Sequence, residues 1–382
     1  MTEIAANTFV PSDGVILSNF ENLGLWTVEG GTLSRGSHLS LTGNKGGKLT
    51  VNSPGGLATM EQDVTALDIP ELISLWAYID NVNSITGFTI YTSSTTDWHK
   101  YLFKNVNYTD LEKGWNLIKI PIKEMQIENG EDISEPFKKI RFYVGARPDN
   151  QPSITFDEVA INVKTSPKVI ISFDDCWRGV YLNAFPYMKS KGLKGTCWVI
   201  PSMLNDGGYH MDEAELKEVY GEGWSVGNHT YNHDDLTKLT RAQIKKTILD
   251  CRDWQLQNEY YRGIDHICYP FGAYNTKVIN IVKNLEFFTG RTVRVLAQEI
   301  PVYNYYALRT NLHLLSSSTF AQAKEKIDGA LATGATLFVV IHDVKDNPVS
   351  ELEMSTALFK EIIDYLLEVK MDVMTIDQWY DA

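Results

Sequence analysis

The chain has 382 residues, of which 43% are hydrophobic and 22% charged, a composition typical of a globular protein long enough for two domains. The formal net charge of −13 argues against nucleic acid or an anionic membrane surface as a partner. No segment approaches the roughly 20 apolar residues that span a bilayer, so membrane insertion is not expected.

The first half of the chain predicts a β-sheet domain. Between about residue 14 and residue 163, short apolar runs alternate with clusters of Gly, Asn, Asp and Ser, which favour turns. Many short strands with frequent turns predict an antiparallel β-sandwich of the jelly-roll type, and we assign residues 1–163 to it. The most distinct predicted strands are 48–51, 72–79, 88–91, 139–144 and 153–163.

After a short linker that ends at Pro167, the pattern changes. Apolar strands now alternate with amphipathic segments of helical length, which predicts parallel βα units in a barrel or a doubly wound sheet. Residues 164–382 are therefore predicted to form an α/β domain. The predicted helices are 180–191, 241–259, 319–331 and 353–369.

Three apolar strands of this second half are each followed by ionisable residues. Strand 169–173 precedes Asp174 and Asp175, strand 224–228 precedes His229, and strand 336–341 precedes His342. The carboxyl ends of parallel strands meet at one edge of a sheet, where catalytic residues gather in such folds. These residues are therefore predicted to form one site.

The spacing of two histidines indicates a metal site. His229 and His233 are four residues apart, so a single helical turn is expected to place both imidazoles on one side. Two imidazoles and one carboxylate leave an open coordination position, as catalytic divalent metals require. The structural alternative is a pair of exposed histidines in a polar loop. The neighbouring aspartate pair and His342 favour the metal site.

Four motifs in this half resemble the polysaccharide deacetylase family, also called carbohydrate esterase family four, with its NodB-like homology domain. The resemblance covers about residues 168–379 and implies a distorted (β/α) barrel. It also implies metal-dependent hydrolysis of N- or O-linked acetyl groups on a polysaccharide. The motifs are Ser172-Phe173-Asp174-Asp175-Cys176, His229-Thr230-Tyr231-Asn232-His233, Cys268-Tyr269-Pro270-Phe271-Gly272 and Val340-Ile341-His342, in the family's order.

The resemblance implies a role for each matching position. Asp174 corresponds to the catalytic base. The resemblance also implies the metal ligands and the cation: Asp175, His229 and His233 would bind Zn²⁺, with Co²⁺, Ni²⁺ or Mn²⁺ as alternatives. Such an ion lowers the pKa of a water molecule from about 15.7 towards about 7 and polarises a carbonyl, which suits acetyl hydrolysis.

The other matching positions concern the leaving group and the oxyanion. His342 corresponds to the general acid, and the backbone N–H of Phe271 to an oxyanion donor. The resemblance implies that three residues around Phe271 shape the substrate-binding loop, namely Tyr269, Pro270 and Gly272.

The chain departs from the family pattern at the oxyanion motif and at the aspartate motif. Cys268 occupies the position of an arginine that orients the catalytic aspartate in relatives, and we expect Arg291 or Arg309 to replace it. Cys176 stands where the family has glycine, which constrains the turn after the aspartates. All four cysteines of the chain are expected to be buried thiols.

A further departure concerns the general acid. The family's fourth motif, whose aspartate tunes that histidine, is not recognisable in this sequence. The residue that tunes His342 therefore has no candidate. Asp343 is adjacent in sequence, but its side chain is expected to point elsewhere.

The N-terminal half suggests a carbohydrate-binding module, with a spacer or a docking module as alternatives. Its aromatic residues are candidates for stacking on sugar rings, although aromatic residues in strands more often pack in the core. The candidates are Trp26, Trp76, Tyr91, Trp98, Tyr101 and Trp115.

Three functions are therefore compared. The first is deacetylation of an acetylated polysaccharide, the second is hydrolysis of a non-sugar amide on the same fold, and the third is glycan binding by an inactive deacetylase domain. The first residues, 1–7, lack a basic region followed by an apolar one, so no secretory signal is predicted. Since a polysaccharide lies outside the cytoplasm, an extracellular site of action is expected, for instance as a component of a phage particle.

Overall fold

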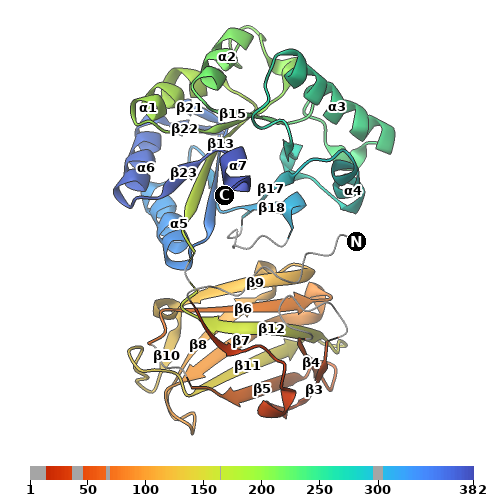
Figure 1. The fold of residues 1–382 in the computed structure, drawn as a ribbon, viewed down its shortest axis with the longest axis vertical. Coiled ribbons are helices and arrows are strands. Elements are labelled where there is room, and N and C mark those ends of the chain that lie inside the picture. Colours follow the sequence, from red (N-terminus) through yellow and green to blue (C-terminus); the bar gives the residue numbers. More distant parts are fainter. Residues whose placement is uncertain (1–13, 37–45, 66–68, 164, 296–303) are drawn as a thin grey trace. The chain divides into compact units, whose positions relative to one another are not determined.

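The structure, a computed structural model, describes residues 14–36, 46–65, 69–163, 165–295 and 304–382 (Figure 1). The chain divides into two compact units, Met1–Thr165 and Ser166–Ala382, which are described separately. Among the helices of the described part, none has the length and apolar character needed to cross a bilayer.

The N-terminal unit consists of two antiparallel sheets of six strands each (Figure 1). The first sheet contains, in spatial order, β3 (Gly31–Arg35), β4 (Gly47–Val51), β12 (Ser153–Ile161), β6 (Leu72–Ile79) and β9 (Gly114–Pro121), with β1 (Val15–Ser18) also paired to β12. The second contains β10 (Gln126–Glu128), β8 (Tyr101–Asn107), β7 (Ile85–Ser93), β11 (Lys139–Ala146), β5 (Leu57–Asp63) and β2 (Thr27–Glu29).

A single apolar core is shared by these two sheets. Along β11, Ile140, Phe142 and Val144 are buried, whereas the alternate residues are half-buried on the other face of the sheet. The ring of Phe142 stacks at 4.8 Å on Phe156, which comes from β12 in the opposite sheet. Successive side chains of a strand thus point alternately into the core and towards the outer face of the sheet. The jelly-roll connection pattern remains a prediction.

The C-terminal unit is built on a nine-stranded parallel sheet. Its order is β18 (Leu308–Thr310), β17 (Thr289–Val295), β16 (His266–Cys268), β15 (Ser225–Asn228), β14 (Thr196–Val199), β13 (Lys168–Asp174), β20 (Thr336–Ile341) and β19 (Leu312–Leu314), with β23 (Asp372–Met374) also paired to β13. Only Asn311 separates the two edge strands in sequence, so the sheet curves into a nearly closed barrel.

Helices lie around this barrel (Figure 1). A short π-helical segment, Val180–Ala184, leads into α1. The α-helices are α1 (Phe185–Ser190), α2 (Glu213–Gly221), α3 (Arg241–Gln257), α4 (Thr276–Asn284), α5 (Phe320–Thr333), α6 (Thr356–Glu368) and α7 (Ile376–Tyr380). Of these, α2, α4 and α7 lie outside the four ranges given above as predicted helices.

One predicted helix begins later than expected. Residues Glu353–Ser355 form the strand β22, which pairs with β21 (Asp343–Lys345), and only then does α6 begin. The hydroxyl of Ser355 accepts a hydrogen bond from the backbone N–H of Leu358 at 3.2 Å and so caps the helix. This cap fixes the start of α6 three residues after the apolar periodicity begins.

Candidate active site

The carboxyl ends of three barrel strands, β15, β13 and β20, form the site; β14 lies between β15 and β13. Asp174 is the last residue of β13, His229 follows β15 and His342 follows β20. All the pairings that connect these strands are parallel, so the three ends share one rim of the barrel. The expectation that these residues come together is met in the structure.

Three of the predicted residues converge on one point. The Oδ1 atom of Asp175 lies 3.4 Å from Nε2 of His229 and 3.5 Å from Nε2 of His233. One ligand atom from each of the three lies within 4.8 Å of the other two. Asp175 and His229 are buried, and His233 is partly exposed, so the cluster opens to solvent on the side of His233.

This geometry fits a divalent metal. Oδ1 of Asp175 is buried and has no hydrogen-bond partner among the described residues, which is costly unless a cation balances it. In a tetrahedral zinc site with bonds of about 2.0–2.2 Å, ligand atoms lie about 3.3–3.6 Å apart. The separations of 3.4 and 3.5 Å fall in that range.

Neighbouring groups orient the three side chains. Nδ1 of His229 lies 2.8 Å from the carbonyl oxygen of Cys268 and donates to it, so Nε2, which faces Asp175, is the nitrogen available to a metal. The indole Nε1 of Trp177 donates to Oδ2 of Asp175 at 3.2 Å. The ring of His210 packs on Trp177 at 4.4 Å. Trp177 was not predicted, although it directly follows the aspartate motif.

The electrostatics of Asp175 and His233 favour the protonation states that metal ligands need. Burial alone would lower the pKa of the His229 imidazole, but its surroundings, chiefly Cys268 and Asp175, raise it, so His229 gives up a proton when it binds a cation. Burial alone would raise the pKa of Asp175, but the nearby imidazoles of His229 and His233 lower it below its ordinary value. Burial, together with the neighbouring His229, lowers the pKa of His233 to about 4. An ionised carboxylate and a neutral imidazole are therefore present at neutral pH.

The expected helical turn between the two histidines is wrong. Residues 229–233 form a loop in which Thr230 has φ 62° and His233 has φ 61°. The amide oxygen of Asn228 accepts a hydrogen bond from the backbone N–H of Thr230 at 2.9 Å. The hydroxyl of Thr230 in turn accepts one from Asp234 at 3.3 Å. These side chains satisfy the backbone in place of helical bonds, and the imidazole rings still lie 4.9 Å apart.

Arg291 lies against Asp174. Its Nη2 atom is 2.5 Å and 2.6 Å from the two carboxylate oxygens, and both side chains are buried. Burial alone would raise the pKa of Asp174, but Arg291 lowers it below its ordinary value. The carboxylate is therefore held ionised beside the metal cluster.

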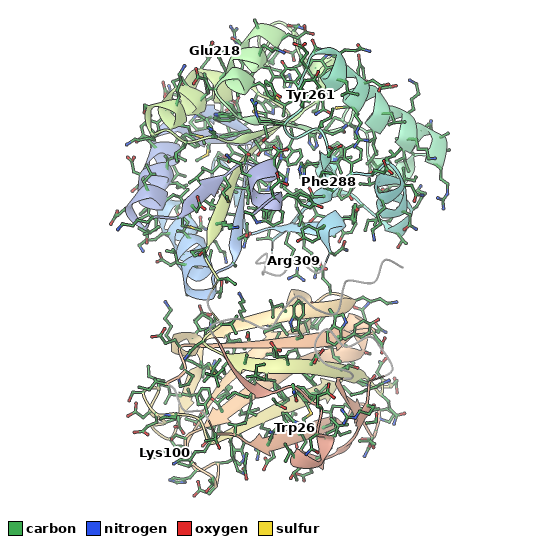
Figure 2. All side chains as sticks on the ribbon, viewed as in Figure 1. Trp26, Lys100, Glu218, Tyr261, Phe288 and Arg309 are labelled. Atoms are coloured by element: carbon green, nitrogen blue, oxygen red, sulfur yellow. The ribbon has the colours of Figure 1, made fainter. Side chains whose placement is uncertain are left out.

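The same arginine contacts Cys268, the residue at the position of the missing motif arginine. Arg291 on β17 is the register partner of Cys268 on β16, and its guanidinium contacts the Cys268 sulfur. A small side chain at position 268 leaves room for this approach. Of the two arginines considered, Arg291 therefore lies against Asp174, whereas Arg309 belongs to the edge strand β18 (Figure 2).

The predicted oxyanion loop has an unusual backbone. Phe271 adopts φ 58° and ψ 11°, its ring is 65% exposed and lies 4.5 Å from that of His233. A left-handed conformation costs a bulky residue about 1–3 kcal/mol and is typical of functional sites. At Gly272, with φ 62°, a Cβ atom would lie 2.7 Å from the backbone nitrogen of Val293.

The other two residues of this loop are internal. Tyr269 is fully buried and donates its hydroxyl to the carbonyl oxygen of Tyr306 at 2.9 Å, and Pro270 is buried beside it. Together with Gly272 they determine the course of the loop, while the exposed part is Phe271. The side chains of Tyr269 and Pro270 are therefore inside the protein, and they can affect a substrate only through the conformation of the loop that carries Phe271.

The backbone conformation of Cys176 is one that favours glycine, the residue that the family motif has at this position. Asp175 and Cys176 have φ values of 68° and 58°, so two successive residues are left-handed. Glycine adopts this conformation without a steric cost, whereas cysteine does not. All four cysteines are free and buried, as expected.

His342 has a partner that the sequence did not reveal. Its Nδ1 lies 3.4 Å from Nε2 of His313, a half-buried residue of β19. Burial, and then the neighbouring His342, lower the pKa of His313, so the imidazole of His313 is neutral at neutral pH. Asp343 points elsewhere, as expected, because its Oδ2 lies 3.2 Å from Nζ of Lys345.

Comparison with known proteins agrees with this geometry. Residues 162–289 match the family described as polysaccharide deacetylase, which confirms the resemblance of this part of the chain. The match includes the aspartate and histidine motifs and ends before Arg291, His313 and His342.

Individual relatives are distant. YxkH of Bacillus subtilis (strain 168), which bears a polysaccharide deacetylase name, is 26% identical over 172 residues, 44% of this chain and 61% of that protein. Poly-beta-1,6-N-acetyl-D-glucosamine N-deacetylase of Staphylococcus aureus (strain MRSA252) is 26% identical over 173 residues, 42% of this chain and 59% of the relative. The chain thus spans about three fifths of these relatives. The solved deacetylase PplD of Streptococcus pyogenes is 25% identical, with 37% of this chain and 62% of that chain covered and a TM-score of 0.34.

Proposed function

We propose that the C-terminal unit removes acetyl groups from a polysaccharide by metal-dependent hydrolysis; the match to the polysaccharide deacetylase family, residues 162–289, lies almost wholly within this unit. One observation supports this proposal above all. A buried carboxylate oxygen without a hydrogen-bond partner, Oδ1 of Asp175, faces two imidazoles, and a second carboxylate lies beside them in contact with a buried arginine.

Asp175, His229 and His233 would hold the cation. Two nitrogens and one oxygen at these separations suit Zn²⁺, with Co²⁺, Ni²⁺ and Mn²⁺ as alternatives. When bound, such an ion supplies Lewis acidity, which acidifies water and polarises an acetyl carbonyl. The hydrogen bond from His229 to the Cys268 carbonyl and that from Trp177 to Asp175 keep the ligand atoms aimed at one point.

Asp174 would act as the general base. Arg291 keeps it ionised and fixes its carboxylate by contacts to both oxygens, so its proton affinity and its position are both defined. A water molecule held between this carboxylate and the cluster gives up a proton to Asp174 as it attacks the acetyl carbon. General base catalysis of this kind contributes about 10²–10⁴ in rate.

The remaining steps use Phe271 and His342. Phe271 has a left-handed backbone and its ring lies beside that of His233; its backbone N–H would donate to the oxygen that becomes negatively charged. His342 then gives a proton to the leaving nitrogen or oxygen as acetate is released. Neutral His313, by accepting a hydrogen bond from Nδ1–H of His342, would hold the opposite nitrogen, Nε2, towards the substrate.

The substrate that we propose to test first is an N-acetylhexosamine polymer. The staphylococcal relative is named for poly-beta-1,6-N-acetyl-D-glucosamine, and the other bears a polysaccharide deacetylase name. An O-acetylated polysaccharide is the second choice, because the same groups serve an ester. Such polymers lie outside the cytoplasm, and an extracellular site of action, for example on a phage particle, follows from that.

The alternative of an inactive glycan-binding domain loses its main support. That alternative depended on the missing motif arginine, whereas in the structure Arg291 contacts the catalytic aspartate. Hydrolysis of a non-sugar amide remains an outcome of the test, since the acetyl-binding residues alone do not select a sugar.

Release of acetate provides the test. The full chain, stripped by chelation and reloaded separately with Zn²⁺, Co²⁺, Ni²⁺ or Mn²⁺, is incubated with β-1,6-linked N-acetylglucosamine oligosaccharides, O-acetylated polysaccharide and small non-sugar acetamides. We expect acetate from a glycan only after reloading, with about one metal per chain. Activity confined to the small amides would favour the second function. Glycan binding without acetate from any metal form would contradict the proposal.

A further inference from the structure

The aromatic residues of the N-terminal unit fall into two groups. Three of the tryptophans are buried: Trp26 is 7% exposed, Trp76 is 4% exposed and Trp115 is 5% exposed. Trp26 belongs to the core between the two sheets (Figure 2). The other three residues proposed for sugar stacking are half-buried and lie on, or directly beside, the second sheet: Tyr91, Trp98 and Tyr101.

Two of these residues, Tyr91 and Tyr101, form a continuous surface with Phe103. Tyr91 on β7 and Phe103 on β8 are register partners with ring centres 5.8 Å apart. The ring of Tyr101 lies 5.7 Å from Tyr91 and 6.2 Å from Phe103. Because Ile90 and Leu102, the adjacent positions on the same strands, are in the core, these rings face away from it. We call Tyr91, Trp98, Tyr101 and Phe103 the aromatic face.

The indole of Trp98 is fixed in place. Trp98 lies between β7 and β8 with φ 58°, a conformation that a bulky residue adopts only when its surroundings hold it. Its Nε1 donates to Oε2 of Glu61 at 3.1 Å, and the guanidinium of Arg141 lies 4.2 Å from its ring centre. Arg141 is also the register partner of Tyr91, so this network adjoins the three other rings. Rings held in this way lose little entropy when a ligand binds.

The charges beside the aromatic face cancel. Lys139 lies 3.2 Å from Glu61 and 3.4 Å from Asp63, and Arg141 pairs with the same Glu61. These two cations thus meet two carboxylates, so this group of four residues carries no net charge that would favour a polyanion. The surface instead offers ring faces beside polar groups that donate and accept hydrogen bonds, a combination that matches an uncharged ligand with apolar C–H faces and hydroxyls.

We propose that the aromatic face binds a neutral polysaccharide, namely the N-acetylhexosamine polymer on which the C-terminal unit is proposed to act. The pyranose rings would stack on Tyr91 and Tyr101, while their hydroxyl and acetamido groups bond to the network of Glu61 and Arg141. The choice of polymer depends on the proposed function; the location of the site on the second sheet does not. Binding here tethers the catalytic unit to its polymer and raises the effective substrate concentration.

The test measures binding and turnover separately in the full chain. Binding of acetylated poly-β-1,6-N-acetylglucosamine is measured by affinity electrophoresis and by calorimetry with its oligosaccharides. We expect the double substitution Tyr91→Ala with Tyr101→Ala, and separately Trp98→Ala, to weaken binding about tenfold or more. The KM for the polymer should rise by a similar factor, with kcat unchanged and with unchanged turnover of a short acetylated substrate.

Two controls exclude loss of structure. Tyr91→Phe with Tyr101→Phe keeps both rings and should bind within about twofold of the parent. Tyr261→Ala removes an aromatic side chain of the C-terminal unit that is 61% exposed, and it should leave binding unchanged (Figure 2). The thermal unfolding midpoint of every variant is compared with that of the parent, and a variant that unfolds early is replaced by the corresponding leucine substitution.

The outcomes separate this proposal from that for the active site. If the parent releases acetate but the folded double variant binds the polymer as tightly as the parent, or the parent binds no polymer, the aromatic face is not a glycan site. If no metal form releases acetate but the double variant loses binding, the glycan site stands and the deacetylase proposal fails. Binding confined to an anionic polymer such as DNA, unaffected by the substitutions, would also overturn the proposal.

Discussion

Arg291 reaches across from β17 so that one of its terminal nitrogens lies 2.5 Å and 2.6 Å from the two carboxylate oxygens of Asp174 at the end of β13. The two residues are separated by 117 positions in sequence and by three intervening strands in the sheet. Their contact supplies, from a different strand, the positive charge that the oxyanion motif lacks.

Replacement of Arg291 should therefore lower kcat. In Arg291→Ala, Asp174 loses its buried partner, and we expect a decrease of about 10–100-fold in kcat with a smaller change in KM. Since Cys268 is the register partner of Arg291, adding Cys268→Arg to that variant should restore part of the rate. Steady-state acetate release tests both, with Arg309→Ala as the matched control. Equal kcat values for the parent and a folded Arg291→Ala variant would refute the role.

Two adjacent aspartates should respond differently to the same substitution. Asp174→Asn should keep the metal and lose about 10²–10⁴ in kcat, because a neutral amide accepts no proton from water. Asp175→Asn should lose metal instead, since the amide replaces a carboxylate that faces two imidazoles. Metal content per chain after dialysis, measured beside acetate release, separates the two effects. Metal loss from Asp174→Asn, with metal retained by Asp175→Asn, would reverse the assignment.

The strand ends of the site could be predicted, because short apolar runs followed by Asp or His are local signals. The contacts between distant strands could not. Whether Arg291 or Arg309 reaches Asp174 depends on the register of β16 with β17, and β17 was not among the strands predicted from the sequence. His313 lies between Leu312 and Leu314 and resembles a structural residue until its strand is placed beside β20.

Local geometry set a second limit on prediction. A spacing of four between His229 and His233 suggested a helical turn, but the side chains of Asn228 and Thr230 hold a loop instead. Similarly, the sequence offered six aromatic residues for stacking. Only their position relative to the core separates Tyr91 from Trp26, and that depends on the tertiary structure.

His313 should set the pH dependence through His342. The acid must be protonated, so activity should fall as the pH rises through its titration, and a neighbour that stabilises the imidazolium should move this alkaline limb to higher pH. His313→Asp introduces a negative charge beside His342 and should therefore shift the limb upward, whereas His313→Ala should lower kcat and shift it downward. Profiles of kcat against pH for the three proteins test this. Superimposable limbs would mean that His313 only packs against its neighbour.

Gly272 and Gly329 should respond in opposite ways to alanine. At Gly272, with φ 62°, a Cβ atom would lie 2.3 Å from a Val293 methyl group and 2.7 Å from its backbone nitrogen, so the loop that carries Phe271 must shift. We expect a loss of about 1–3 kcal/mol in the free energy of unfolding and a lower kcat.

Gly329 lies within α5, and nothing approaches its Cβ position within 4 Å. Gly329→Ala should therefore stabilise the protein by about 0.5–1 kcal/mol with kcat unchanged. Denaturant unfolding and acetate release measure both. If Gly272→Ala has the stability and the kcat of the parent, the oxyanion loop does not depend on this glycine, and the role given to the Phe271 backbone loses its structural basis.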